Sequence, residues 1–136
     1  EGSWARQILG LMERFEGRVF ADVSFHVKFG GSGEAQERYF GHLRGLLADE
    51  RYRGQILWGT DYHLVRQAVT EREYEEVFRR ELGDGLFGLI SGENGMRFLG
   101  FRMEEGRMVG VRANMVRHLE WLYEQGAGMG GSTRVP

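Results

Sequence analysis

Hydrophobic positions near the start of the chain follow two successive spacings. Over residues 4–15 apolar side chains recur every three or four positions, which predicts an amphipathic helix. Ser3 can cap the start of this helix, and Gly17 can end it. From residue 18 to residue 29 the spacing changes to two, with apolar side chains at the odd-numbered positions. That alternation predicts a β-strand with one apolar face.

The middle of the chain continues with further helices and a short apolar strand. Apolar spacing predicts a second helix around residues 39–47, and the run 55–61 is typical of a buried strand. Thr70 and Glu73 form the pattern of a capping box, which predicts a third helix from that point. The remaining expected elements are short helical turns at 86–90 and 96–101 and a terminal helix over 115–123.

The order helix, strand, helix, strand, helix indicates α/β architecture, with helical crossovers between parallel strands. Only two strands are clear, and two strands leave a row of unpaired amides on each outer side. We therefore expect an incomplete sheet. A first residue that is Glu1 rather than Met agrees with this expectation and favours truncation upstream. We expect one partial domain over residues 1–125 and a Gly-rich, disordered tail over 126–136.

Composition excludes several classes of protein. With 41% hydrophobic residues the chain can form a core, and a net charge of -2 provides no basic surface for nucleic acid. The absence of cysteine excludes disulfides, thiolate nucleophiles and Cys-based zinc sites. No apolar run approaches the roughly 20 residues of a membrane span, and no signal peptide is evident. A cytoplasmic protein without membrane or nucleic-acid partners is expected, and homo-oligomer formation is left open.

Asp61 is the first candidate catalytic residue. The apolar strand before it ends in Gly59-Thr60-Asp61, so a carboxylate stands at the C-terminal tip of a strand, where α/β barrels gather catalytic groups. An Asp after a strand is also a common helix cap or turn former. The sequence pattern alone does not decide between these two roles.

The polar face of the first strand carries Asp22, Ser24 and His26, which resemble a nucleophile triad in composition. Neighbours on one face of a strand are about 6.6 Å apart, too far for the hydrogen bonds of a relay, so we reject a triad. We expect this face to point into a barrel lumen, with Ser24 and His26 on the active-site rim. A histidine satisfied in the core or at the rim is the more frequent reading of His26. His63 lies two residues beyond Asp61 and is a further rim candidate.

Three segments resemble one enzyme family. Residues 56–62, ILWGTDY, are similar to the ILFGTDYP signature on the eighth strand of the amidohydrolase-related barrels (amidohydrolase 2 type). Residues 4–24 resemble that family's pattern W..IL.LM.RYPNVYADLS, and residues 93–101 resemble its closing ENPARFLGL. The segments keep the family's order and spacing. His63 and Gly95 stand where proline is usual, so the loop after Asp61 departs from the family pattern.

The resemblance implies the C-terminal part of a (β/α)8 TIM barrel, about strands seven and eight with their flanking helices. It implies metal-dependent hydrolysis, or decarboxylation, of a small carbonyl substrate. Asp61 would bind a divalent metal, zinc by analogy, or act as the base that deprotonates the attacking water. The family's other ligands, a His-x-His and two further histidines, would lie before Glu1. We therefore expect the fragment alone to be inactive.

Two alternatives remain. Residues 22–27 and 42–44 faintly resemble the opening of BTB protein-interaction domains, which would make the chain a dimerising adaptor without catalytic activity. That reading explains neither Gly59-Thr60-Asp61 nor the closing segment 97–100. The chain could also be a degenerate barrel remnant that has lost its catalytic function.

Overall fold

The structure of the protein is a computed structural model that describes residues 3–24 and 33–124. The chain forms two compact units, Glu1–Phe98 and Leu99–Pro136. The domain expected over residues 1–125 therefore extends across both units. The expected tail, 126–136, lies outside the described residues. Within the described ranges, no helix is both long enough and apolar enough to cross a membrane.

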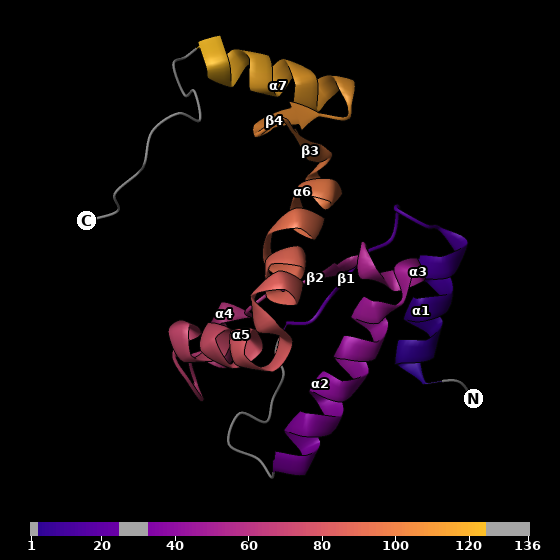
Figure 1. Cartoon of the computed structure of the whole chain (residues 1–136), viewed down its shortest axis with the longest axis vertical. Coiled ribbons are helices and arrows are strands. Elements are labelled where there is room, and N and C mark those ends of the chain that lie inside the picture. Colours follow the sequence, from indigo (N-terminus) through magenta and orange to yellow (C-terminus); the bar gives the residue numbers. More distant parts are fainter. Residues whose placement is uncertain (1–2, 25–32, 125–136) are drawn as a thin grey trace. The chain divides into compact units, whose positions relative to one another are not determined.

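The first unit contains most of the helices and one small parallel sheet (Figure 1). Its elements in chain order are α1 (Trp4–Arg14), β1 (Ala21–Asp22), α2 (Gly33–Ala48), α3 (Glu50–Arg53), β2 (Ile56–Leu57), α4 (Tyr62–Val65), α5 (Glu71–Gly88), the π-helix η1 (Leu89–Glu93) and α6 (Asn94–Leu99).

Helix α1 begins as its sequence predicts and ends at Arg14, with Phe15 as its C-cap. The hydroxyl of Ser3 accepts a hydrogen bond from the backbone N–H of Arg6, which satisfies one of the free donors of the first turn. Gly17 follows the helix with a φ of 68°, a left-handed conformation that glycine adopts without steric cost. The predicted first helix is confirmed.

Strands β1 and β2 pair in parallel, as the α/β pattern predicts, although both are short. Ala21 lies opposite Ile56, and Asp22 lies opposite Leu57. The backbone N–H groups of Ala21 and Val23 donate to the carbonyl oxygens of Gln55 and Leu57, each at 2.9 Å. The predicted first strand ran to residue 29, but its pairing is limited to two residues here, and positions 25–29 lie outside the described residues.

The two faces of this sheet differ as the alternating pattern predicts. Val19, Ala21 and Val23 pack against the buried core, as do Ile56 and Trp58 of the β2 segment. Helices α2 and α5 supply the aromatic centre of that core. The ring of Phe78 lies 5.1 Å from Phe40, 5.0 Å from Tyr74 and 6.3 Å from Trp58, centroid to centroid. Asp22, on the other face, is exposed.

The outer edge of β2 is not left unpaired, which corrects the expectation of two bare edges. The side-chain amide of Asn94 donates to the carbonyl oxygens of Arg53, at 2.7 Å, and Ile56, at 2.8 Å. The backbone N–H of Trp58 donates to the carbonyl of Ile90 at 3.0 Å. The chain of η1 and α6 therefore takes the place of a neighbouring strand along part of this edge.

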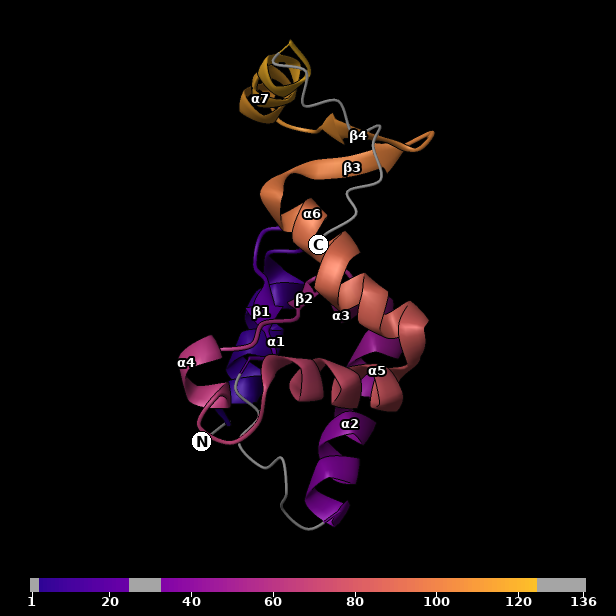
Figure 2. The ribbon, with the colours of Figure 1, turned by 90° about the vertical axis from the view of Figure 1, so that its left-hand side faces the viewer.

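Helix α5 starts at the predicted capping box and bends in its last third. Thr70 and Glu73 exchange backbone and side-chain hydrogen bonds at the start of the helix. Gly83 has φ 75° and ψ 160°, so the helix turns sharply there, as Figure 2 shows. The turns predicted at 86–90 and 96–101 belong to the end of α5, η1 and α6, but Phe101 begins a strand.

The second unit holds a β-hairpin that the sequence analysis missed. Strands β3 (Phe101–Glu104) and β4 (Arg107–Gly110) pair antiparallel, and helix α7 (Ala113–Glu124) follows them. Glu105 and Gly106 form the turn with positive φ values of 48° and 77°. Helix α7 confirms the predicted terminal helix.

Replacement of Asn94 by Ala is expected to lower the free energy of unfolding by about 3 kcal/mol, because two backbone carbonyls lose their donor in the interior. Asn94 is fully buried, so water cannot replace the lost amide. Urea denaturation measures the change. Asn114→Ala, at an exposed position on α7, is the control. A loss below 1 kcal/mol for Asn94→Ala would contradict this role.

Replacement of Glu73 by Gln is expected to lower the melting temperature at pH 7 and to lower it less at pH 3. Hydrogen bonds from the backbone N–H and then the hydroxyl of Thr70 lower the pKa of Glu73. Because the folded pKa is depressed, the stabilisation is present above the unfolded pKa of about 4.3 and is lost as the pH falls through the folded value. Thermal melts at both pH values test this. Glu120→Gln, at an exposed position on α7, is the control variant.

Candidate functional site

Asp61 lies just beyond the C-terminal end of β2 and begins α4. Its backbone carbonyl accepts hydrogen bonds from the N–H groups of Leu64 and Val65, at 2.9 and 3.1 Å. Its φ and ψ are 45° and 58°, which is the left-handed helical region. Residues other than Gly, Asn and Asp seldom adopt this conformation, because Cβ approaches the carbonyl oxygen.

The carboxylate of Asp61 is exposed and does not cap α4, although the residue occupies the cap position. The cap alternative raised by the sequence therefore does not describe this side chain. At this position the chain needs a left-handed backbone conformation, which Asp tolerates. The carboxylate itself is left accessible to a small molecule.

Asp22 and Ser24 are joined at the C-terminal end of β1. Oδ1 of Asp22 accepts a hydrogen bond from the backbone N–H of Ser24 at 3.0 Å and a second, short one from its hydroxyl. The residue spacing of a regular strand predicted no hydrogen bond between these two side chains, and for this pair the prediction is wrong. The paired part of β1 ends at Asp22, so the chain is free to turn and bring Ser24 back to the carboxylate.

Gly59 brings the β2 segment close to this pair. A Cβ atom on Gly59 would lie 3.2 Å from Cβ of Ser24 and 3.9 Å from Cβ of Asp22. The absence of a side chain at this position therefore allows the close approach. Asp22 was not among the predicted site residues, although its place on the same strand face as Ser24 was visible in the sequence.

Of the other two rim candidates, only His63 lies within the described residues. His63 is exposed on α4, where its ring lies 5.1 Å from the ring of Tyr62. His26 lies outside the described residues. Within residues 3–24 and 33–124, no three His, Asp or Glu side chains form a group that could hold a metal ion. The described residues thus do not by themselves fit the metal that the family resemblance implies.

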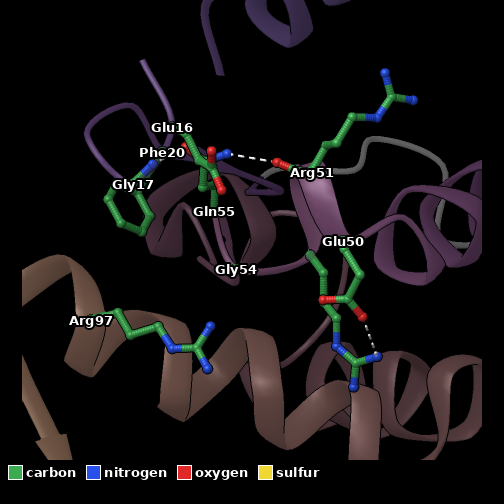
Figure 3. Close-up of a pocket in the computed structure, with 9 residues that line it drawn as sticks. Glu16, Gly17, Phe20, Glu50, Arg51, Gly54, Gln55 and Arg97 are labelled. Atoms are coloured by element: carbon green, nitrogen blue, oxygen red, sulfur yellow. Dashed lines mark hydrogen bonds and ion pairs between the residues drawn. The ribbon is translucent and has the colours of Figure 1, made fainter. Parts of the chain in front are cut away.

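A cavity of about 300 Å³ lies at the other end of the strands (Figure 3). Its lining comes from segments that precede β1 and β2 and from α6: Glu16, Gly17, Phe20, Glu50, Arg51, Arg53, Gly54, Gln55 and Arg97. Sequence reasoning missed this cavity, because its walls come together only in the folded unit.

Gln55 fixes the floor of the cavity. Its side-chain oxygen accepts a hydrogen bond from the N–H of Gly17 at 2.8 Å, and its amide donates to the carbonyl of Arg51 at 2.8 Å. Gln55 is only 3% exposed, so these bonds satisfy a buried polar group and tie the two segments that precede the strands.

Comparisons with protein-family models, with curated proteins and with solved structures gave no match to this chain. The resemblance to the amidohydrolase-related family therefore rests only on the local motifs at residues 4–24, 56–62 and 93–101.

Replacement of Asp61 by Gly is expected to leave the free energy of unfolding unchanged or raise it by up to about 1 kcal/mol. Glycine adopts the left-handed conformation without steric cost, and no capping bond is lost. Urea denaturation provides the measurement, with Asp49→Gly as the contrasting variant, because Asp49 does cap α3 through its side chain. A clear loss of stability for Asp61→Gly would show that the carboxylate has a structural role.

Proposed function

We propose that the first unit is the strand-seven and strand-eight part of an amidohydrolase-type (β/α)8 barrel, acting in hydrolysis of a small carbonyl compound. Three features support this: two parallel strands joined through helices, a helix-covered face opposite a polar one, and a carboxylate after the second strand. In barrel enzymes catalytic groups lie at the C-terminal ends of strands.

The proposal rests on the exposure and the backbone conformation of Asp61. The side chain is exposed and makes no cap bond, while its backbone holds a conformation that most residues avoid. Because this exposed carboxylate makes no cap bond to α4, it can accept a proton. We assign to it the role of general base: it removes a proton from water while the water oxygen attacks the substrate carbonyl carbon.

The family resemblance also implies a divalent metal, zinc by analogy, with Asp61 among its ligands. Such a metal would lower the pKa of bound water and polarise the carbonyl when present. The described residues supply no second and third ligand beside Asp61, so no step of the proposal depends on it. Asp22 and Ser24 are close to the β2 end through Gly59 and would line the same edge.

The test compares Asp61→Asn with the parent in the natural-length protein that contains this chain. Asparagine keeps the shape of the side chain and tolerates the left-handed backbone, but it cannot take up the proton. We expect kcat to fall by about 10²-fold or more on a panel of small amides, lactones and esters, with the circular dichroism spectrum unchanged.

Asp84→Asn is the matched control, because Asp84 is an exposed carboxylate of α5 whose contact is an ion pair with Arg79 at 3.0 Å. Its kcat should equal that of the parent. Full activity of Asp61→Asn, or no turnover of any panel member by the zinc-supplemented parent protein, would overturn the proposal.

A further inference from the structure

The cavity before β1 and β2 lies at the opposite end of the sheet from Asp61, so the proposed chemistry does not use it. Its volume of about 300 Å³ is at the lower end of the range for small-molecule sites. That space would hold on the order of ten waters or one small organic molecule. The charges of its walls show which kind of molecule fits.

Most of the charged groups in the wall are already paired. The guanidinium of Arg51 contacts carboxylate oxygens of Asp49 at 2.6 Å and of Glu13 at 2.8 Å. Arg53 lies 3.8 Å from Glu50. Within the described part of the chain, Glu16 and Arg97 line the cavity without an ion-pair partner. The wall therefore offers one free carboxylate and one free guanidinium.

Arg97 is directed to the cavity by the geometry of α6. Asn94 anchors the first turn of this helix to the segment before β2 through its bonds to Arg53 and Ile56. Arg97 follows three residues later on the same helix face. Its Nη1 lies 2.9 Å from where a Cβ of Gly54 would stand, and Figure 3 shows the side chain extended toward Gly54.

Phe20 adds an apolar part to the wall of the cavity. Its ring is half-buried and meets Phe98 edge to face, with centroids 5.3 Å apart. Phe98 is the neighbour of Arg97 on α6, so one short helix fixes both the aromatic pair and the cation. A side chain that entered the cavity would contact the ring of Phe20.

We propose that this cavity binds a free α-amino acid with an apolar side chain. The ligand carboxylate would pair with Arg97, its ammonium group with Glu16, and its side chain would pack on Phe20. A ligand with only negative charge is opposed by Glu16 and Glu50, and one with only positive charge by the three arginines. Opposite charges on one small molecule match the unpaired groups of the wall.

Isothermal titration of the 136-residue chain with L-phenylalanine tests the proposal. Saturable binding is expected, and 3-phenylpropionate and phenylethylamine, which each lack one charge, should bind about tenfold more weakly or worse. Absence of saturable binding at 10 mM ligand, on the order of the weakest affinity such a site would have, would overturn the proposal. Equal binding of either single-charge analogue would overturn it as well.

Variants assign the two charges. Arg97→Gln and Glu16→Gln should each weaken L-phenylalanine binding about tenfold or more, whereas Arg72→Gln, exposed on α5 outside the cavity, should leave it unchanged. Gly54→Ala is a second variant that tests the role of Arg97. Gly54 has φ -83° and ψ 0°, which alanine also adopts, so the new methyl group should displace the flexible guanidinium without unfolding the chain.

Gly54→Ala should therefore weaken binding in the same direction as Arg97→Gln, with the melting temperature retained. If both variants bind as tightly as the parent, Arg97 does not hold the ligand and the proposal fails. These measurements need no substrate turnover, so their outcome is independent of the proposed role of Asp61.

Discussion

The first unit depends on how a two-stranded sheet satisfies backbone groups that its own strands leave unpaired. Ala21 and Val23 direct their N–H groups to β2, so Asp22 between them directs its backbone away from β2. On the other side, Asn94 and Ile90 bond to the outer edge of β2. The packing of η1 and α6 meets this requirement, because a buried carbonyl or amide without a hydrogen-bond partner costs free energy.

The two edges of this sheet differ in how they could meet further strands of the proposed barrel. A further strand could join the sheet beside β1, where the backbone of Asp22 faces outward. Closure of a ring on the β2 side would require the N–H of Trp58 to exchange the carbonyl of Ile90 for one on a strand. The amide of Asn94 would also have to release Ile56 or share it, since a carbonyl oxygen has two lone pairs. A further strand could therefore pair with the β1 edge directly, whereas at the β2 edge existing hydrogen bonds would have to change first.

Local patterns in the sequence predicted the fold where neighbours in the chain decide the structure. Ser3 and the pair Thr70 and Glu73 act within one helical turn, and each is found in its predicted role. The spacing of apolar residues also gave the two faces of the sheet. The hairpin after Phe98 was missed, because its four-residue strands carry only a brief alternation, which helical periodicity over 96–101 outweighed. The role of Asn94 was missed as well, since periodicity arguments assume that a polar residue faces water.

The candidate site was predictable only in part, for a related reason. The position of Asp61 follows from the end of an apolar strand, but the contact of Asp22 with Ser24 depends on where pairing stops, which spacing does not encode. Strands shorter than their apolar pattern leave free chain at both ends of the sheet. At the C-terminal end that chain turns and brings Ser24 to Asp22, and at the N-terminal end it forms a wall of the cavity with Arg97. The same short pairing thus creates two chemically different ends, with an exposed carboxylate at one and a pair of unmatched opposite charges at the other.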